Sequence, residues 1–576
     1  MRSTCATSPP TRRWSCASPG TADRPMPTLR SQLQRAIAHA VSAAAASGDV
    51  RLAGEAPPVT IERPARPEHG DYATNVAMQL APLVRANPMQ TARTLAAHLV
   101  LPDGMATASV APPGFINLSL DPAWVAGQVQ QIRDAGDAFG RLTAEQPRSF
   151  NVEFVSANPT GPLTVGNARG AFVGDLLCRV LEGAGHHVTR EYYFNDSGAQ
   201  VRNLGLSVMA RHDGQELPED GYHGGYVADL ATELPDDVWT DAQAADDPAW
   251  RIGEWASARI REQIEASLAH LGVRFDVWKS EGSLHTDGWV DRGVAKLREA
   301  GYLYEQDGAT WFRSTDFGDD KDRVVYRSNG APTYFASDIG YLLEKFSRGF
   351  DELIYVWGAD HHGTVARNRA AAQALGFDPQ DVQWLLIAWV RFIRDGEEMS
   401  MSKRSGEFVT LDELLEEIGV DAARWFIGSR GASVGIDFDI QLAKQQSNEN
   451  PVYYVQYAHA RSASILRNAA ERSLTPDASQ AAELLTHPAE QALIRRLLAL
   501  PDVVADAAAR RETQDLPRYC YEVASLYSQF YRDCRVLSDE PSEAALSAAR
   551  LSLVDATRQV LRNGLGLMGI SAPDTM

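Results

Sequence analysis

The sequence predicts an α/β protein in three parts: a small α+β unit at residues 27–145, a central unit with a parallel sheet at residues 148–435, and an all-helical bundle at residues 440–576. Three observations support this. Strand and helix patterns alternate through the middle of the chain, which is typical of a parallel sheet with crossover helices. Only helical periodicity follows residue 440. The length of 576 residues also exceeds that of a single domain of about 150 residues.

Composition excludes several classes of protein. A hydrophobic share of 44% and a charged share of 23% exclude a disordered chain, a collagen and a coiled-coil rod. The net charge of −20 argues against a protein that coats nucleic acid, although a local basic groove stays open. Apolar runs fall far short of the ~20 residues that span a bilayer, so we expect no membrane partner. The five scattered cysteines predict no metal site and favour a reducing cytoplasm.

Residues 1–26 form an extension that we expect to lie outside the folded domains. They lack the apolar core of a secretory signal. They are either an organelle-type presequence or the result of a start codon assigned too early. We favour the second interpretation, because Met26 is followed by a helix pattern in Leu29, Leu33 and Ile37.

The N-terminal unit mixes helix and strand patterns. An Ala-rich helix runs to about residue 46, and a second helix is expected at residues 75–84. Residues 106–110 and 115–120 alternate like strands, and the prolines and glycine at residues 112–114 predict a turn between them.

The central unit contains two predicted strand–helix–strand units. They lie at residues 150–154, 172–181 and 188–194, and at residues 353–356, 365–375 and 382–390. Between the two halves we expect an insertion at about residues 205–325, which is strongly acidic around residues 213–247. Much of the negative charge therefore belongs to an appendage.

The loop at residues 156–170 joins the first of these strands to its helix. A helix N-terminus presents free backbone N–H groups and partial positive charge, which suit a phosphate. Gly166 and Gly170 would let a flat ligand approach the backbone closely. The alternative, a Gly/Pro-rich turn that only connects two elements, stays open on spacing alone.

The stretch Ala157–Gly170 resembles the HIGH region of class I aminoacyl-tRNA synthetases and, over its whole length, the arginyl-tRNA synthetase family. Thr164 and Asn167 stand where the motif has its two histidines. A hydroxyl and an amide can still donate hydrogen bonds to ATP oxygens. The resemblance implies a class I, Rossmann-type nucleotide-binding domain in which Thr164, Gly166 and Asn167 bind ATP and Thr164 and Asn167 act in catalysis.

Residues 399–406 resemble KMSKS, the second class I motif. Ser400 replaces its first lysine, and Lys403 matches its second. Only six lysines occur in the chain, so a lysine here suggests a need for a compact, flexible point charge. Such a cation neutralises charge on a leaving pyrophosphate. The resemblance makes Ser402 and Lys403 ATP-binding residues and Lys403 catalytic; the alternative is a solvated polar loop.

The resemblance also implies an arginine site. A guanidinium is a planar fork of donors that carboxylates and amides match well. Tyr334 and Asp338 would share one helix face if that segment is helical. Taken singly, each candidate is more simply a structural or surface residue, and together on one scaffold they favour function. The expected arginine-binding residues are Glu153, Asn158, Tyr334, Asp338 and His361, although His361 could equally be a turn histidine.

Residues 450–461 resemble the start of the family's helical anticodon-binding domain. Splayed RNA bases stack on aromatic rings and on Arg planes. Tyr453, Tyr457, Arg461 and Arg535 are therefore candidate tRNA contacts, although a tyrosine stripe at helical spacing is more often core packing. Residues 70–75 and 113–117 look like the family's N-terminal extra domain, which implies contact with the tRNA elbow.

The resemblance covers residues 27–576 and implies a monomeric arginine–tRNA ligase. It would convert ATP, L-arginine and tRNA(Arg) to AMP, diphosphate and L-arginyl-tRNA(Arg) through arginyl-adenylate, with Mg²⁺ on the phosphates. Because both ATP motifs are altered, a non-catalytic tRNA-binding paralogue is the first alternative. A class I synthetase for another amino acid and a small-molecule adenylyltransferase are the others. The arginine-site candidates and Lys403 argue against the first. The paired acids and the absence of a large editing insertion argue against the second, and the two flanking domains argue against the third.

Overall fold

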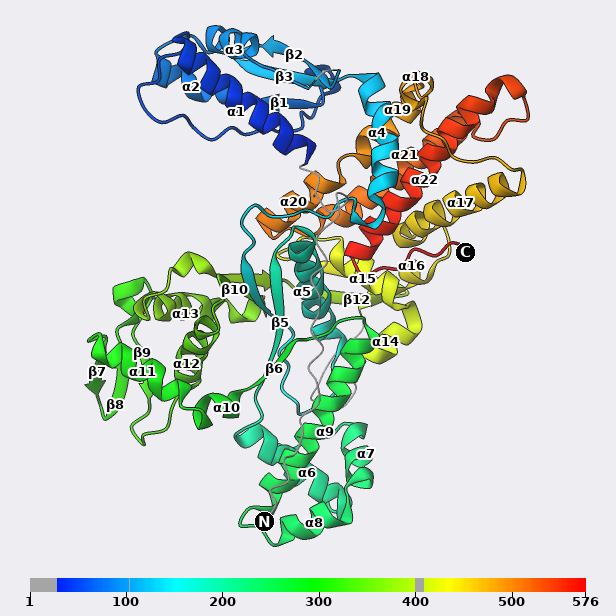
Figure 1. The fold of residues 1–576 in the computed structure, drawn as a ribbon. Helices are drawn as coiled ribbons and strands as arrows, with labels where there is room; N and C mark the ends of the chain where they lie inside the picture. The colour runs from blue at the N-terminus through cyan, green and yellow to red at the C-terminus, as the bar shows by residue number, and fades with distance from the viewer. Residues whose placement is uncertain (1–27, 103, 399–408) are drawn as a thin grey trace, which may run out of the picture.

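The computed structural model of the chain describes residues 28–102, 104–398 and 409–576 (Figure 1). The extension at residues 1–26, together with Ser402 and Lys403, lies outside the described residues.

The N-terminal domain packs three helices against a small antiparallel sheet. Its sheet order is β1-β3-β2, and the predicted strand pair is confirmed as β2 and β3, which pair antiparallel from Ala106↔Leu120 to Ala111↔Phe115. The helix expected at residues 75–84 is α2. The elements are α1 (Leu29–Ser47), β1 (Tyr72–Thr74), α2 (Val76–Val84), α3 (Pro88–Ala97), β2 (Ala106–Ala111) and β3 (Phe115–Leu120), followed by α4 (Pro122–Ala135).

The central sheet is parallel throughout, with the order β11-β10-β4-β5-β6. Its strands are β4 (Ser149–Glu153), β5 (His187–Phe194), β6 (Val277–Ser280), β10 (Glu352–Gly358) and β11 (Val382–Ile387). Both predicted strand–helix–strand units are confirmed, with α5 (Val165–Gly183) and α13 (His362–Ala374) as crossovers. The chain leaves β4 toward β5 on one side and leaves β10 toward β11 on the other. Ligands bind at such a switch point, outside the carboxyl ends of the strands.

The expected insertion consists of two parts, because β6 returns to the sheet beside β5. The first part is helical and projects away from the N-terminal domain (Figure 1). It contains α6 (Ala199–His212), α7 (Gly225–Glu233), α8 (Asp236–Gln243) and α9 (Pro248–His270). The second part is α10 (Glu281–Thr286), α11 (Trp289–Glu299) and a small antiparallel sheet of β7 (Leu303–Gln306), β8 (Ala309–Phe312) and β9 (Arg323–Tyr326), and α12 (Tyr334–Ser347) leads back to β10.

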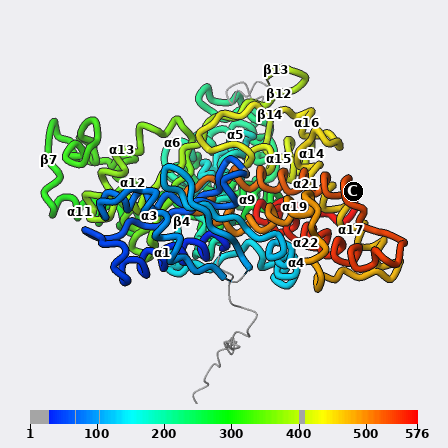
Figure 2. The backbone as a smooth tube through the Cα atoms, turned by 90° about the horizontal axis from the view of Figure 1, so that it is seen from above, coloured from blue at the N-terminus to red at the C-terminus, as the bar shows by residue number. Residues whose placement is uncertain are grey.

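A small sheet and three helices connect the central domain to the helical bundle. They are β12 (Val390–Arg394), β13 (Glu397–Glu398), α14 (Leu411–Ile418), α15 (Val420–Gly428), β14 (Ile436–Asp439) and α16 (Ile440–Lys444). The bundle consists of α17 (Pro451–Glu471), α18 (Ala481–Leu484), α19 (Pro488–Leu497), α20 (Leu500–Arg510), α21 (Asp515–Asp533) and α22 (Ala544–Leu567). Seen from above, the bundle occupies one end of the molecule and the β7–β9 unit the other (Figure 2). No helix in the described ranges is both long and apolar enough to cross a membrane.

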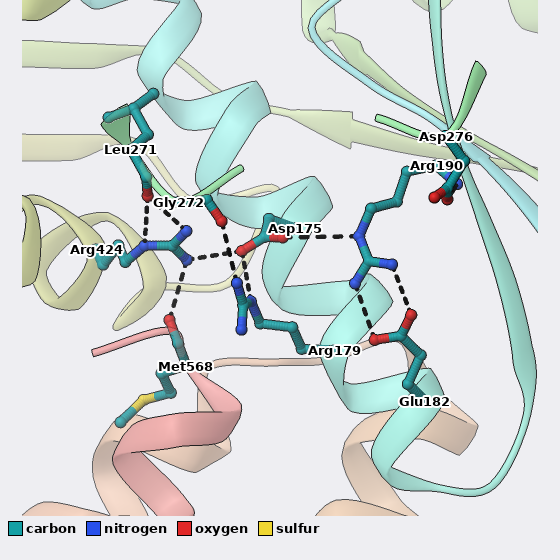
Figure 3. A network of polar contacts seen from close by, with 9 residues as sticks. All are labelled: Asp175, Arg179, Glu182, Arg190, Leu271, Gly272, Asp276, Arg424 and Met568. Carbon is teal, nitrogen blue, oxygen red and sulfur yellow. Dashed lines mark hydrogen bonds and ion pairs between the residues drawn. The ribbon is translucent and has the colours of Figure 1, made fainter. Parts of the chain in front are cut away.

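A buried ion pair and its hydrogen bonds join α15 and the bundle end to the central domain (Figure 3). The guanidinium of Arg424 on α15 lies 2.8 Å from the Asp175 carboxylate of α5, and both side chains are 2% exposed. Arg424 also donates to the carbonyls of Leu271, after α9, and Met568, after α22. Arg179, on the same helix as Asp175, donates to the same carboxylate oxygen at 2.7 Å. One guanidinium therefore ties the crossover helix α5 to both the insertion and the end of the bundle.

Candidate active site

A cavity of about 570 Å³ lies at the carboxyl ends of β4 and β10, at the switch point of the sheet. Most of the residues predicted for ligand binding line this cavity together. Their separate sequence motifs could not show that they share one cavity. The predicted residues at its wall are Glu153, Asn158, Gly166, Asn167, Tyr334, Asp338 and His361.

The turn after β4 has a strained backbone. Val155 and Ser156 have φ angles of 68° and 45°, which are unfavourable for non-glycine residues and most of all for a β-branched one. Neighbouring β5 stabilises the turn: the Tyr193 N–H donates to the Ser156 hydroxyl at 3.2 Å, and the Tyr192 hydroxyl donates to the Ala157 carbonyl at 2.9 Å. This turn lies between Glu153 and Asn158, and both line the cavity.

The N-terminus of α5 lies beside the cavity, and its residues Gly166 and Gly170 line the cavity wall without a side chain. Thr164 caps the helix, and the amide oxygen of Asn167 accepts from the Thr164 N–H at 3.0 Å and from its hydroxyl at 3.2 Å. The buried Thr164 hydroxyl is thus engaged by Asn167, which itself lines the cavity with Gly166 and Gly170. The Asn167 amide N–H groups are the donors that this arrangement leaves for a ligand.

The chain that follows residues 399–408 returns to the start of α5. The Val165 N–H donates to the Val409 carbonyl at 3.3 Å, and the Leu411 N–H donates to the Leu163 carbonyl at 3.0 Å. Thr164 and Thr410 form an antiparallel bridge between them. Residues 409–411, which follow the second motif in the chain, are therefore held against the start of the helix that carries the first.

A buried arginine fixes the far side of α5. Arg169 is 1% exposed, and burial lowers its pKa to about 10. Its guanidinium donates to carbonyls of two segments, one next to cavity residue Ile387 and one after α15. The acceptors, at 2.7 to 3.0 Å, are Ala388, Trp389, Gly431 and Val434. Arg169 thus holds the loop beyond β11 against the ATP-motif helix.

Four carboxylates line the cavity; the side chain of one of them, Asp360, is 82% exposed, and the other three are less exposed. Glu153 is 3% exposed and lies 2.6 Å from the ammonium of Lys345, whereas Asp338 lies 3.6 Å from the guanidinium of Arg367. The third, Glu281 on α10, was not predicted. No motif in the sequence marks Glu281; it reaches the cavity only because β6 joins the sheet immediately before it.

The environment of these carboxylates raises the pKa of two of them. Burial raises the pKa of Asp338 to about 7; Arg367 opposes this rise, while the negative charges of Glu281 and Glu153 add to it. Burial also raises the pKa of Glu281, against hydrogen bonds from the Tyr193 and Ser337 hydroxyls. Carboxylates perturbed in this way within one cavity are typical of a functional site.

Comparison with known proteins agrees with this geometry. Residues 31–120 match the arginyl tRNA synthetase N-terminal domain, residues 128–220 and 241–432 match the catalytic domain of class I (R) tRNA synthetases, and residues 455–576 match the DALR anticodon binding domain. An arginine–tRNA ligase of Moorella thermoacetica is 47% identical over 557 residues, covering 95% of this chain and 98% of the relative. The chain belongs to the arginyl-tRNA synthetase family.

Further relatives of this synthetase give the same result. An arginine–tRNA ligase of Desulforudis audaxviator is 46% identical over 564 residues, covering 95% of this chain and 99% of the relative. The structure of the Thermus thermophilus arginyl-tRNA synthetase superposes with a TM-score of 0.76 at 25% identity, covering 95% of this chain and all of that one. The predicted family and the predicted class I fold are confirmed.

The anticodon-binding domain of this synthetase carries a row of aromatic rings on α17 and α21. Tyr453 and Tyr457 stack with centroids 6.3 Å apart and planes 7° apart. The Arg461 guanidinium lies 4.7 Å from the Tyr457 ring and 5.0 Å from that of Tyr531, which is 45% exposed. Arg535 instead lies beyond the end of α21, where it donates to the Leu537 carbonyl. Three of the four residues predicted to contact tRNA, namely Tyr453, Tyr457 and Arg461, thus lie next to one another, and Tyr531 lies beside them.

Proposed function

We propose that this cavity is where the synthetase activates arginine, in the reaction of its family. ATP, L-arginine and tRNA(Arg) give AMP, diphosphate and L-arginyl-tRNA(Arg) through arginyl-adenylate. One observation carries the assignment of the site: three carboxylates, Glu153, Glu281 and Asp338, face one cavity beside the N-terminus of α5. The carboxylates can bind a guanidinium, and the helix N-terminus attracts a triphosphate.

The arginine side chain enters between α12 and the turn after β4. Asp338 and Glu153 accept hydrogen bonds from the guanidinium, and Glu281 adds negative charge from α10. Asn158, Tyr334 and His361 complete the walls. Tyr334 is 69% exposed at the first turn of α12, and the His361 side chain is 56% exposed, so both are free to close on a substrate at the rim.

ATP binds along the start of α5 as its magnesium complex. Gly166 admits the nucleotide to the backbone, Asn167 donates from its amide, and Thr164 holds Asn167 in place. The arginine carboxylate attacks the α-phosphorus; a new P–O bond forms while the bond to pyrophosphate breaks. Ser402 and Lys403 contact the departing phosphates. A ribose hydroxyl at the tRNA terminus, the 2′-hydroxyl by analogy with the family, then attacks the arginyl carbonyl and releases AMP.

Charging of total tRNA with each amino acid, in the presence of ATP and Mg²⁺, tests this proposal. Arginine alone should be incorporated. Citrulline has the same shape with a neutral ureido group, so it should be rejected at least about 1,000-fold, because the carboxylates would lose their cation. Folded protein that binds tRNA without charging it would instead support the non-catalytic paralogue, and incorporation of another amino acid would refute the arginine site.

Arginine binding should weaken as the pH falls below about 7. Asp338 must be ionised to bind a guanidinium, and its pKa in the free protein is raised to about 7. The Kd for arginine should therefore rise by up to about tenfold for each pH unit below 7 and level off above 8. Calorimetric titration between pH 5.5 and 9 measures this. Glu281→Gln should move the midpoint to lower pH, because the negative charge of Glu281 raises the pKa of Asp338. A Kd that is constant from pH 6 to 8 would contradict the prediction.

The tyrosine row should bind the tRNA, since bases stack on exposed rings. Tyr457→Ala should raise the Kd for tRNA(Arg) by about 5- to 160-fold, corresponding to the 1–3 kcal/mol measured for one stacked base. The Kd for arginine should stay unchanged. Tyr519→Phe is a matched control: it alters a fully buried tyrosine of the same domain, on α21. Equal effects of the two substitutions on tRNA binding would show that the row does not contact tRNA.

We further propose that the synthetase works as a monomer in the cytoplasm. The candidate sites for ATP, arginine and tRNA all lie on one chain. The cysteines in the described ranges, Cys178, Cys520 and Cys534, are buried free thiols, which suits a reducing compartment.

A further inference from the structure

A buried lysine lies directly behind the proposed arginine site. Lys345 of α12 has a fully buried side chain, and its ammonium donates to Oε2 of Glu153 at 2.6 Å. The aromatic rings of Tyr341 and Tyr355 lie 4.3 and 4.0 Å from the nitrogen. Glu153, Tyr341 and Tyr355 all line the cavity. Lys345 thus forms the layer beneath the wall that the substrate would contact.

This pairing fixes how Glu153 is presented to the cavity. Oε2 is engaged by Lys345, whereas Oε1 has only a long contact, 3.3 Å, with the Ser156 hydroxyl. A second cation therefore has its less engaged acceptor at Oε1. Lys345 on Oε2 and Ser156 on Oε1 together hold both carboxylate oxygens, which limits the direction from which that cation approaches.

Lys345 also sets the charge of the cavity. Asp360 is 82% exposed at the edge of the cavity and is left out of this balance. When all the other groups are ionised, the carboxylates of Glu153, Glu281 and Asp338 are opposed by the cations of Lys345 and Arg367. One negative charge remains, which one guanidinium neutralises. Without Lys345 a second negative charge would stay buried beside the bound substrate, and such uncompensated charge is costly.

The residue type supports a specific role. Only six lysines occur among the 55 basic residues of this chain, so arginine is the default cation. A guanidinium at this position would present five donors to surroundings that consist of two aromatic rings and one carboxylate oxygen, so most donors would lack an acceptor. An ammonium is a more compact charge that fits between these groups.

We infer that Lys345 is a positioning residue for arginine recognition: from behind the cavity it orients Glu153 and leaves a single negative charge for the substrate guanidinium. This inference rests on the arginine site proposed above. Lys345 acts through Glu153, and its own nitrogen does not contact arginine.

The other charged groups around Lys345 are engaged elsewhere. Glu191 of β5 is bound by the Tyr341 hydroxyl at 2.6 Å, by Asn151 at 2.6 Å and by Arg348 at 2.7 Å. Glu344 on the same helix pairs with Arg348 at 3.1 Å and with Lys279 at 3.4 Å. Burial raises the pKa of Glu191, and the charges of Lys345 and Arg348, with the hydrogen bonds to this carboxylate, lower it by more. The carboxylate that Lys345 contacts directly is nonetheless Glu153.

The test compares Lys345→Met with Lys279→Met. Lys279 also pairs with a glutamate of the α12 region and is nearly buried, but it does not line the cavity or touch Glu153. Lys345→Met should raise the Kd for arginine at least about tenfold and move the midpoint of its pH profile upward, because removing a nearby cation makes the cavity carboxylates retain protons. The Kd for ATP should change less than twofold. Lys279→Met should alter none of these quantities by more than twofold.

A double-mutant cycle shows whether Lys345 acts through Glu153. In a Glu153→Gln background, Lys345→Met should cost little further arginine affinity. Lys345→Gln retains an N–H donor and about the same size, so it covers the case in which Lys345→Met fails to fold; the pH midpoint should still shift. Equal losses of arginine and ATP affinity, or additive effects in the cycle, would overturn the inference and indicate a purely structural role.

The outcomes separate this inference from the proposed arginine site. If Glu153→Gln and Asp338→Asn leave the Kd for arginine unchanged, the site itself is wrong. If both weaken arginine binding while Lys345→Met behaves like Lys279→Met, the site is right and the role of Lys345 is wrong.

Discussion

Asp338→Asn should nearly abolish arginine charging while leaving ATP binding intact. The carboxylate would accept two charge-assisted hydrogen bonds from the guanidinium, and an amide can offer only one acceptor and no charge. Truncating one member of a buried charged pair costs about 2–5 kcal/mol. We therefore expect kcat/KM for arginine to fall by a factor of about 100 to 1,000. Steady-state charging at saturating ATP and tRNA, together with titration of ATP, measures both parts of the prediction.

The same substitution should make the fold more stable. Burial raises the pKa of Asp338 from 3.8 to about 7 in the folded state. Folding therefore takes up protons between these values, and ionised Asp338 destabilises the folded state above pH 7. Asp338→Asn should raise the free energy of unfolding at pH 8 by the order of 1 kcal/mol, and the gain should vanish toward pH 4.

Asp360→Asn is the matched control for both measurements. Asp360 also lies at the edge of the cavity, but its side chain is 82% exposed. It should change kcat/KM for arginine by less than about threefold and leave stability nearly unchanged. Loss of charging in both variants, or loss of stability in Asp338→Asn, would mean that Asp338 supports the fold and does not bind the substrate.

The parts of this site that the sequence predicts are those with local signals. Alternating Phe150, Val152 and Phe154 predicted β4, and the helical spacing after it predicted α5. The positions of Tyr334 and Asp338, four residues apart, fit the first turns of α12. These patterns depend on residues close together in the chain, so periodicity is enough to find them.

The parts that the sequence does not predict depend on long-range contacts. Glu281 reaches the cavity because the chain re-enters the sheet at β6 after four helices. Lys345 pairs with Glu153 across 192 residues, and the four carbonyl partners of Arg169 lie at least 219 residues away. A helix pattern shows only that such residues lie on an inward face. It does not show which distant strand or loop faces them, and the partner decides whether a buried charge is structural or functional.

Lys403→Ala should produce the second large loss of activity. Lys403 lies outside the described residues, whereas residues 409–411, which begin six residues further on, lie within them. The chain is paired to the start of α5 at Val409–Leu411, and six residues of chain reach at most about 20 Å. That reach allows Lys403 to contact the helix end that is proposed to bind the ATP phosphates. With serine in place of the first lysine of the motif, Lys403 is the motif's one lysine.

We therefore expect Lys403→Ala to lower the rate of adenylate formation by about 100- to 1,000-fold, the cost of removing one group that stabilises charge in a transition state. The KM for ATP should rise much less, because the charge on the leaving pyrophosphate builds up only during the reaction. Pyrophosphate exchange with saturating tRNA present measures the rate. Arg404→Ala removes the adjacent cation and should cost less than tenfold. If the two variants lose activity equally, a diffuse positive charge binds the phosphates; if neither does, the altered motifs no longer work by the class I scheme, and Thr164, Asn167 and Ser400 are losses of function.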